Sequence, residues 1–596
     1  MTERASYEGD IEENWVGGGP YDSWRISNFK SIGSVSADCQ GGHITVLTGS
    51  NSIGKSSFIQ SLLMLCQSVN YGRRVLLNGP LVSLGKPIDV IRTGTDCLHI
   101  EMGFIHHYIM PKVTAIPVKA ELSLRIDNNN ANAIDSEALT IDRIAFKGDK
   151  GFSFTLVKAK CTSKDYQHCM EYLPEGEEQD LSVFRVTPSG EKTLYRSYAI
   201  FRGFEPVMVI RFRTKQESYR AYRDELMEYF YETKAPTLNA YMYRRIEDEF
   251  YEMGYKVNVD WRGRNRVEVL NSFSKLSDRE QDQLIRNVAE TLSRNVIALC
   301  RNIENEVMLN RPASDWVVRL DKTIKNNHFD YLSLLLITYA ATIKRFVDRL
   351  QYIGPLRDDP RVVSALDEVA SPNLPIGMKG ERAPSLLLTE QGTSGTFGLP
   401  DASAPTKVSF EQALDAWARY LGIADSVRAE NLAKYGVGLS VTSDSLADGD
   451  LTMVGVGASQ VIPIILGVLS APHSSILLIE QPELHLHPSA QSRLADFFLY
   501  ARPDLSYIVE SHSEALVTRL RRRVVEESSL ASRISILFLE RHGFGQGVIS
   551  RQLAIDEYGN LDEWPIGFMD AVQDDTRCIM KAAIAKRRQK GGLGDA

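Results

Sequence analysis

The stretch HITVLTGSNSIGKSSFIQSLLMLC, His43–Cys66, is the part of the chain that predicts its fold most directly. It contains one complete G-x-x-x-x-G-K-[ST] motif, which runs from Gly49 to Ser56. The apolar run Ile44–Leu47 predicts a strand before the motif. After the motif, apolar residues recur at helical spacing, at Phe58, Leu62, Leu63 and Leu65. A strand, a loop and a helix in this order predict a phosphate-binding loop.

The residue types in this loop suit a bound nucleotide. Gly49 and Gly54 let successive backbone N–H groups turn toward a β-phosphate, and the helix N-terminus adds partial positive charge. Lys55 is expected to reach the β- and γ-phosphate oxygens, and Ser56 is expected to hold Mg²⁺. The alternative is a glycine-rich turn between a core strand and a core helix, in which a buried Lys55 would have no task.

Length and composition indicate the class of protein. With 596 residues the chain is too long for one ordinary core, so we expect two or more domains, or one domain with a large insertion. A hydrophobic content of 43% and a charged content of 24% are typical of a soluble globular protein. The seven cysteines are odd in number and lack metal-ligand spacing, which indicates reduced thiols. No secretory pattern and no apolar run of membrane-spanning length occur, so we expect a cytoplasmic protein without a membrane partner.

The charge of the chain gives no direct sign of a nucleic-acid partner. The net charge is −8, with acidic and basic residues mixed throughout, although a local basic patch stays open. The best candidate is WRGRNR, Trp261–Arg266, because arginines and aromatic rings can stack on bases and pair with phosphates. Acidic residues lie equally close, at Glu247, Asp248, Glu249 and Glu252. A solvated hairpin is therefore the favoured interpretation, and DNA remains an open partner.

The N-terminal part of the chain predicts a tail and a β-rich lobe. Residues 1–22 are acidic and glycine-rich and predict a flexible tail. Residues 23–214 predict an N-terminal lobe that contains the phosphate-binding loop. Alternating apolar residues in Trp24–Ile32 predict its first strand, and short alternating strands from about Cys97 predict an antiparallel β region.

The rest of the chain predicts a helical insertion and a second lobe. Residues 215–350 have helical periodicity, and the clearest helix begins at a capping box, Ser277–Glu280. Residues 351–596 predict a C-terminal lobe that starts with a short strand. About sixty residues after Asp358 are rich in glycine, proline, serine and threonine and are expected to be loops.

A phosphate-binding loop needs an acidic residue at the end of a second strand, where it can help to hold the metal. The best candidate lies in ILLIEQPELHLHP, Ile476–Pro488, where four apolar residues lead into Glu480 as in a buried parallel strand. Upstream, VGASQ at Val456–Gln460 opens an apolar helix. Downstream, the apolar strand Leu505–Glu510 is followed by His512. Ser56 and Glu480 are therefore the predicted metal-binding residues.

This order of motifs resembles the ATP-binding-cassette (ABC) ATPases, and most closely the SMC/RecF-like and OLD-type (overcoming lysogenisation defect) bacterial ATPases. Their heads carry an NFKS-like strand, a GxNxxGKSS loop, a signature helix, an acidic segment and a switch histidine. These features match Asn28–Ser31, Gly49–Ser57, Val456–Gln460, Glu480–Pro488 and His512. The resemblance covers about residues 23–100 and 350–520. It implies an α/β ABC-ATPase head with a mixed β-sheet and an antiparallel β subdomain, interrupted by a helical insertion.

The resemblance also implies a set of residues that bind ATP with Mg²⁺. They are Asn28, Lys30, Gly49, Asn51, Ser52, Gly54, Lys55, Ser56, Ser57, Gly457, Ser459 and Gln460. ABC-type sites are completed in trans, so Gly457–Gln460 is expected to face solvent in a monomer, and we expect a homodimer or a larger homo-oligomer. The segments YIGPLR (Tyr352–Arg357) and IDEYGNLDEWPIGF (Ile555–Phe568) look like a subgroup common in bacterial antiphage and mobile-element loci.

Three positions depart from the family pattern. The signature is VGASQ in place of an LSGGQ-like sequence, although Gly457 and Ser459 can still donate to a γ-phosphate. Gln481 stands where the family usually has the glutamate that polarises the attacking water, and an amide cannot take the proton of that water. Hydrolysis is therefore expected to be slow unless Glu483 or His512 acts instead. A family-type glutamine loop is also missing, and Asp89 is the nearest substitute.

The OLD-type nucleases carry a metal-dependent Toprim domain after the ATPase, which needs a glutamate and a D-x-D motif. The 84 residues after His512 contain no D-x-D, so we expect no nuclease in this chain and any cleaving activity in a separate effector protein. Two functions stay open. The first is an ATP-gated dimeric scaffold or sensor for that effector in antiphage defence, which Gln481 favours. The second is an actively cycling SMC/RecF-like ATPase in DNA maintenance or repair.

Overall fold

The computed structural model places most of the chain in two compact units. Met1–Lys150 and Thr338–Ala596 form the first unit, and Gly151–Ile337 forms the second. The residues that the structure describes are 23–39, 42–72, 74–109, 113–127, 138–148, 153–170, 181–188, 196–212, 223, 226–227, 229–231, 240–253, 266–301, 316–319, 331–358, 361–364, 373–400, 402–443, 446–541, 543, 547–562 and 571–591. The predicted tail 1–22, residues 261–265 of the WRGRNR segment and residues 563–568 lie outside them.

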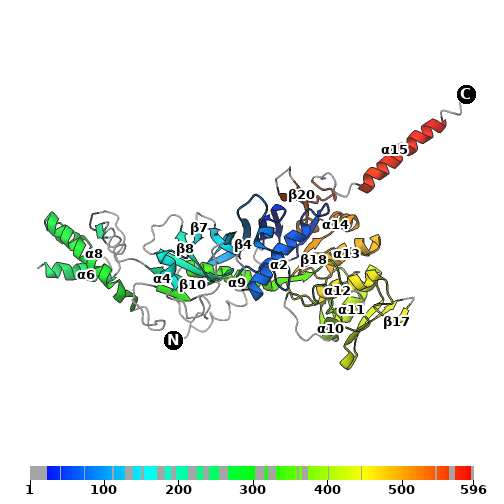
Figure 1. Ribbon diagram of the computed structural model, residues 1–596, viewed down its shortest axis with the longest axis horizontal. Helices are drawn as coiled ribbons and strands as arrows, with labels where there is room; N and C mark the ends of the chain where they lie inside the picture. Colours follow the sequence, from blue (N-terminus) through cyan, green and yellow to red (C-terminus); the bar gives the residue numbers. More distant parts are fainter. Residues whose placement is uncertain are drawn as a thin grey trace. The chain divides into compact units, whose positions relative to one another are not determined.

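A mixed sheet forms the centre of the first unit (Figure 1). In spatial order its strands are β6 (Ala138–Gly148), β5 (Val113–Asp127), β4 (Leu98–Ile109), β1 (Ser23–Phe29), β2 (Ile32–Asp38), β21 (Val548–Leu553), β20 (Ile534–Arg541), β3 (Ile44–Gly49), β19 (Ser506–Glu510), β18 (Ile476–Glu480) and β12 (Leu350–Ile353). The run from β20 to β12 is parallel, whereas β6, β5, β4, β1 and β2 pair antiparallel.

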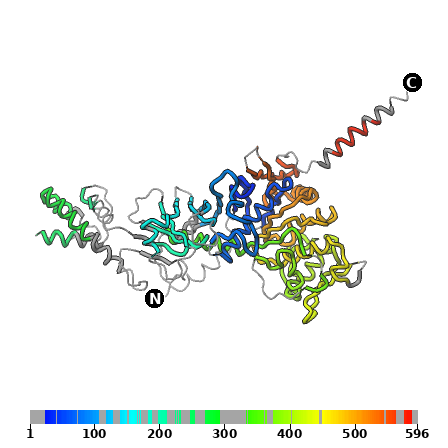
Figure 2. Tube along the Cα trace, in the orientation of Figure 1, coloured from blue at the N-terminus to red at the C-terminus, as the bar shows by residue number. Residues whose placement is uncertain are grey.

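The parallel strands carry the segments that the sequence analysis singled out. β3, β18 and β19 read ITVLTG, ILLIE and SYIVE, near-continuous apolar runs of the kind found in strands buried on both faces. β19 lies between the other two, and its Glu510 is in register with Leu47 on β3 and Glu480 on β18. Figure 2 shows these blue and orange segments side by side, although they come from opposite ends of the chain. The loop after β3 and the two glutamates therefore lie together at the carboxyl ends of three neighbouring strands.

Helices pack against this sheet and share its core. α2 (Lys55–Tyr71) contacts β1, β2 and β3, while α12 (Val456–Ser470) contacts α10 (Ala383–Glu390) and α11 (Phe410–Leu421). α13 (Pro488–Tyr500) contacts α11 and α14 (Glu514–Glu526). The remaining elements are α3 (Pro87–Val90), β13 (Ser394–Phe397), β14 (Thr406–Ser409), β15 (Ser426–Asn431), η2 (Ala433–Tyr435), β16 (Val437–Ser443), β17 (Leu446–Asp450), η3 (Ser528–Arg533) and α15 (Ala571–Gly591).

The expectation that about sixty residues after Asp358 are loops is wrong, because α10 and α11 lie among them. Ser409 caps α11: its hydroxyl accepts from the backbone N–H of Gln412, and the Gln412 amide oxygen accepts from the N–H of Ser409. The helix buries Leu414 and Trp417 in the core shared with β18 and β19. The capping box and the helical spacing of apolar residues in α11 are visible in the sequence, but the glycine, proline, serine and threonine content of the whole stretch predicted loops.

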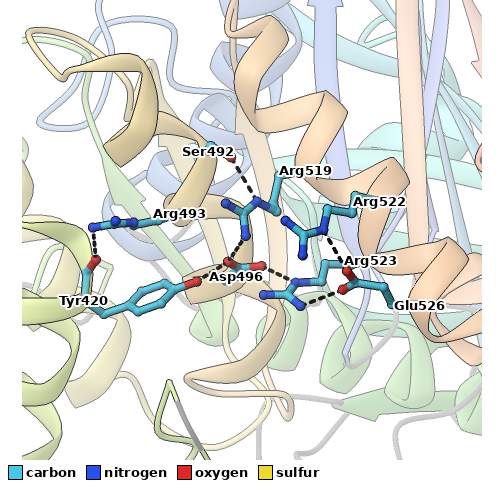
Figure 3. A network of polar contacts seen from close by, with 8 residues as sticks. All are labelled: Tyr420, Ser492, Arg493, Asp496, Arg519, Arg522, Arg523 and Glu526. Carbon is cyan, nitrogen blue, oxygen red and sulfur yellow. Dashed lines mark hydrogen bonds and ion pairs between the residues drawn. The ribbon is translucent and has the colours of Figure 1, made fainter.

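A buried carboxylate joins three of these helices (Figure 3). Asp496 of α13 has a side chain only 3% exposed, and it accepts hydrogen bonds from three donors. They are the hydroxyl of Tyr420 at 2.5 Å, Nη1 of Arg519 at 3.1 Å and Nε of Arg523 at 2.6 Å. Tyr420 belongs to α11 and the two arginines belong to α14. The carboxylate therefore fixes the mutual packing of α11, α13 and α14.

The second unit contains antiparallel strands and a set of helices. Its elements are β7 (Ser153–Lys158), α4 (Lys164–Met170), β8 (Leu181–Pro188), β9 (Arg196–Arg202), β10 (Glu205–Phe212), α6 (Ala240–Glu252), α7 (Arg266–Phe273), α8 (Asp278–Arg301) and β11 (Trp316–Arg319). The helix α9 (Tyr331–Arg349) includes residues of both units. β7 to β11 pair in sequence order, and the packed helices bury Phe250, Phe273 and Leu284 among others.

One half of the predicted capping box is present directly before α8, since Glu280 Oε2 accepts from the Ser277 N–H at 2.8 Å, while the Ser277 hydroxyl donates to the same carboxylate oxygen at 2.6 Å. The strand β11, in contrast, was not predicted within the helical region. The N-terminal segment of the first unit ends at Lys150, before the end of the predicted lobe 23–214, because β7 to β10 belong to the second unit. The fold class is confirmed as α/β, with a mixed sheet, antiparallel strands, and helices that lie between β10 and β12 along the chain.

Candidate functional site

Two glycines shape the loop between β3 and α2. Gly49 has φ +140° and Gly54 has φ +117°, backbone conformations that L side chains rarely adopt. A Cβ on Gly49 would lie 2.6 Å from the carbonyl oxygen of Leu539, and one on Gly54 would lie 2.8 Å from Oγ of Ser31. Both positions therefore require glycine, which keeps the loop close to its neighbouring strands.

The loop leaves the start of α2 open to a ligand. The N-cap residue of α2 is Gly54, and no side chain caps the helix. The N–H groups of a first helical turn have no intrahelical partner, so they attract an anion. Asn51 and Ser52 are exposed on the loop, and Ser57 is partly buried in the first turn of the helix. This cradle fits a phosphate group.

Lys55 is a buried cation whose hydrogen bonds go to backbone carbonyls. The side chain is 3% exposed, and Nζ donates to the carbonyl oxygens of Gly49 at 3.1 Å and Ser50 at 2.9 Å. It forms no ion pair with any residue that the structure describes. Burial lowers its pKa, while the charges of Glu510 and Glu483 oppose that shift. An anionic ligand would give Lys55 a direct ion pair.

Two carboxylates lie opposite the hydroxyl of Ser56. Glu480 and Glu510 are 5% and 3% exposed, and they end neighbouring strands in register. Ser56 Oγ donates to Oε2 of Glu510 at 2.8 Å, and the Tyr352 hydroxyl donates to Oε1 of Glu480 at 2.9 Å. Burial and the charge of Glu510 raise the pKa of Glu480 to about 7, and burial also raises the pKa of Glu510.

These oxygen donors suit Mg²⁺, which is usually held by one or two carboxylates together with substrate phosphates. Among the described residues, no group of three or more His, Cys, Asp or Glu side chains could hold a metal by itself. The residues therefore fit a metal site that nucleotide oxygens complete.

The three residues proposed for the attacking water lie near this edge, with different partners. Gln481 has φ +46°, and its N–H donates to the Glu510 carbonyl at 2.8 Å. Oε1 of Glu483 accepts from the backbone N–H of His512 at 2.6 Å, which places these two predicted residues in contact. Oε2 of Glu483 is buried and makes no hydrogen bond in the described part of the chain. Burial raises the pKa of Glu483, and burial lowers that of His512.

Arg357 connects the end of β18 to the predicted signature helix. Its guanidinium donates to the carbonyl oxygens of Glu480 at 2.9 Å and Gln481 at 3.0 Å. Its backbone N–H donates to Oε1 of Gln460 at 3.3 Å. Burial lowers the pKa of Arg357 to about 10, although Glu483 opposes this shift. The buried arginine therefore links the first turns of α12 to the strand that ends in Glu480.

The expectation that Gly457–Gln460 faces solvent in a monomer is wrong for three of its four residues, because Ala458, Ser459 and Gln460 are buried. Ser459 and Gln460 are 4% and 6% exposed, because α12 packs into the core and Gln460 bonds to Arg357. Ser459 Oγ donates to the carbonyl of Val456 at 2.8 Å. A Cβ on Gly457 would lie 2.8 Å from the carbonyl oxygen of His485, so a glycine permits this close approach. The exposed residue at the start of α12 is Val456.

Asn28 and Lys30 have partners within the chain. The Asn28 amide donates to the Cys97 carbonyl at 3.2 Å, and Lys30 Nζ donates to Oε1 of Gln60 at 2.8 Å. Both side chains therefore brace the turn between β1 and β2, and their contact with a nucleotide stays a prediction. Asp89 accepts from the N–H of Lys86 at 2.9 Å at the start of α3, which is a capping role.

Three residues of this site lie in segments quoted from the sequence but had no predicted role: Tyr352, Arg357 and Glu510. Glu510 had a readable signal, since it ends an apolar strand as Glu480 does. Tyr352 and Arg357 had only the signal of belonging to a quoted motif. Their contacts depend on the pairing of β12 with β18, which sequence spacing does not show.

Comparisons with known proteins identify part of this region. Residues 444–518 match the family model described as "AAA domain, putative AbiEii toxin, Type IV TA system". Residues 531–578 match a family described as "Protein of unknown function (DUF3696)". No curated protein matches the chain. The segment that contains α12, β18 and β19 is therefore similar to an AAA-type ATPase domain.

The similar solved structures are distant. One is an Smc head bound to the C-winged helix domain of ScpA, with 10% identity and a TM-score of 0.29, covering 90% of this chain and 99% of that one. Another is an Smc head with an extended coiled coil bound to the C-terminal domain of ScpA, derived from Pyrococcus furiosus, with 9% identity and a TM-score of 0.29, covering 90% and 96%. Scores this low support no argument about function. Within the described residues, no helix is long and apolar enough to cross a membrane.

Proposed function

We propose that this chain is an ABC-type ATPase that binds ATP with Mg²⁺ and acts as a nucleotide-gated dimeric scaffold or sensor for a separate effector in bacterial antiphage defence. The observation that carries the ATP-binding part is the placement of Lys55 and Ser56. A buried cation that forms no direct ion pair with the described residues and a hydroxyl beside two strand-end carboxylates lie on one glycine-shaped loop. A simple core turn would have no use for this arrangement.

In this proposal each residue of the candidate site has a task. The first-turn N–H groups of α2 bind the β-phosphate, and Lys55 leaves its loop carbonyls to contact the β- and γ-phosphate oxygens. Ser56 and Glu480 would hold Mg²⁺. The bound metal would neutralise charge that develops on the phosphates. Glu483 and His512 are the residues that would lie beside the γ-phosphate, and a hydrogen bond joins the two segments that carry them.

Slow hydrolysis follows from the side chain of Gln481. An amide can orient a water molecule but cannot accept its proton, and general-base assistance contributes about 10²–10⁴-fold. A chain that keeps ATP bound for a long time suits a scaffold, because the bound nucleotide can hold two copies together. The role in defence is supported by the AbiEii description of the matched family, which concerns that family and enters here as a proposal.

The test of this proposal is ATP binding by Lys55→Ala. We expect the variant to lose binding of a fluorescent, non-hydrolysable ATP analogue, because the only side-chain cation at the loop is removed. Lys434→Ala is the matched control, since Lys434 is exposed and lies beside Tyr435. Thermal unfolding of both variants shows whether the fold is intact. Undiminished binding by a folded Lys55→Ala chain would contradict the assignment.

The second candidate function is an actively cycling ATPase in DNA maintenance or repair. One observation favours it: Oε2 of Glu483 is buried and has no hydrogen-bond partner in the described part of the chain, so this carboxylate is available as a base. ATP turnover with and without duplex DNA separates the two functions. Brisk turnover that DNA stimulates supports cycling, whereas weak turnover with tight binding supports the scaffold.

A further inference from the structure

The strand between the phosphate-binding loop and Glu480 carries a carboxylate to which the sequence motifs assign no role. Glu510 ends β19, which pairs with β3 on one side and with β18 on the other. Its side chain is 3% exposed, and it lies beside Ser56, the predicted metal-binding hydroxyl. A buried carboxylate next to a second one is unfavourable unless a cation or hydrogen bonds stabilise it. Glu510 is thus kept in a costly place that the folding of the sheet alone does not require.

The direction of the hydrogen bond at Ser56 shows what Glu510 can do. A hydroxyl has one proton to donate and two lone pairs. The proton of Ser56 goes to Oε2 of Glu510 at 2.8 Å, so the lone pairs of Oγ remain available on the side away from Glu510. A metal ion is bound through such a lone pair. A hydroxyl whose proton rotated freely would present that lone pair only part of the time.

The second carboxylate is held by a different donor. Glu480 Oε1 accepts from the hydroxyl of Tyr352 at 2.9 Å, and Arg357 holds the backbone carbonyl of the same residue. Tyr352 and Arg357 therefore hold Glu480 from β12 and the segment that follows it. The Ser56 hydroxyl, which donates to Glu510, also lies close enough to Glu480 to lower the pKa of Glu480.

We propose that Glu510 is the positioning residue of the Mg²⁺ site. Its carboxylate accepts the proton of the Ser56 hydroxyl and so directs the Oγ lone pairs toward the metal. This inference rests on the proposed ATP-binding function and adds to it. Groups that orient metal ligands in this way typically change metal affinity by about 10–100-fold when they are removed. Glu510 also adds a second negative charge to the site, beside that of Glu480.

The experiment measures metal binding rather than turnover. Mn²⁺ is titrated into the full-length chain with a non-hydrolysable ATP analogue, and bound Mn²⁺ is followed by electron paramagnetic resonance. We expect Glu510→Ala to weaken Mn²⁺ binding by about 10–100-fold. Glu510→Gln should weaken it less, because the amide oxygen still accepts the Ser56 proton. Glu430→Ala, a change at an exposed glutamate of β15, should have no effect.

A double-mutant cycle with Ser56→Ala separates positioning from general electrostatics. If Glu510 acts through Ser56, then Glu510→Ala should cause little further loss once the hydroxyl is absent. Full additivity of the two changes, or unchanged Mn²⁺ binding by Glu510→Ala and Glu510→Gln, would overturn the inference. Should Glu510→Ala fail to fold, Glu510→Gln with Ser56→Ala forms the same cycle. Failure of the unaltered chain to bind the analogue would instead refute the proposed function.

Discussion

Backbone hydrogen bonds hold Gln481, the residue that we propose slows hydrolysis. Its N–H bonds to Glu510 and its carbonyl accepts from Arg357, so the direction in which its side chain leaves the strand end is fixed. We expect Gln481→Glu to hydrolyse ATP faster than the unaltered chain, by up to about 10²-fold, because a carboxylate can accept the water's proton. Phosphate release at saturating ATP and Mg²⁺ measures this rate.

Glu483→Gln is the companion variant for that measurement. If Gln481→Glu is no faster, and Glu483→Gln removes the activity, then Glu483 is the base and the chain is an ordinary ATPase. If neither change alters a rate that is already brisk, then the assignment of residues after β18 to the attacking water is wrong.

Glu480 predicts a pH dependence of stability in the metal-free chain. Burial and Glu510 raise its pKa from 4.5 to about 7, so between these values the folded chain keeps a proton that the unfolded chain has released. The contribution of Glu480 to the free energy of unfolding is therefore present at low pH and is lost as the pH rises toward about 7. Urea denaturation in EDTA, from about pH 5 to pH 8, measures the free energy of unfolding at each pH. This free energy should depend less steeply on pH in Glu480→Gln than in the unaltered chain. Equal slopes in the two proteins would contradict the shift.

The sequence predicted the site residues that lie in contiguous motifs. It did not predict the site residues that strand pairing brings together. Gly49, Gly54, Lys55 and Ser56 follow from one motif, and the structure brings them to one edge of the sheet with Glu480. Glu510 could not be assigned in the same way. Its place beside Ser56 depends on β19 lying between β3 and β18, and strand order is not encoded in local spacing.

Among the elements, α13 and α14 depend most on one buried carboxylate. We expect Asp496→Asn to destabilise the chain by about 3 kcal/mol, because Arg519 and Arg523 would lose their common countercharge in a mostly buried place. Urea denaturation followed by circular dichroism measures the change. Glu526→Gln is the control. Glu526 is a more exposed partner of Arg523, and surface pairs contribute about 0–1 kcal/mol. A loss no larger than that of the control would show that α11, α13 and α14 do not depend on Asp496.

The helices also show where composition misleads. The glycine, proline and serine content after Asp358 predicted loops, yet Phe410, Leu414 and Trp417 recur at helical spacing directly after a capping box. The helical periodicity of the 12 residues of α11 predicts its structure better than the composition of the surrounding stretch does. Burial of one face of a helix against the core supplies most of its stability. The strand β11 had no such signal, since four residues are too few for a period.

For the whole molecule, the central expectation is a dimer that forms with ATP. We expect the mass from light scattering to double at micromolar concentration when a non-hydrolysable ATP analogue and Mg²⁺ are added. Val456→Asp should stay monomeric and still bind the analogue, because Val456 is 53% exposed at the start of the predicted signature helix. Val525→Asp, at a residue 51% exposed on α14, is the matched control. A strict monomer with the analogue and Mg²⁺ present would contradict the dimer.

Several residues of the candidate site that are not glycine have positive φ, and this affects how the protein would change under selection for heat resistance. Among the described residues, seven that are not glycine have positive φ, and five belong to the segments of the candidate site: Asn28, Lys30, Ser52, Gln481 and His485. Each such conformation costs about 1–2 kcal/mol. A laboratory evolution experiment that rewarded heat resistance alone would therefore favour glycine at these positions. The same replacements would remove the side chains of Ser52 and Gln481, so survivors of that selection should be more heat-resistant and poorer at handling the nucleotide.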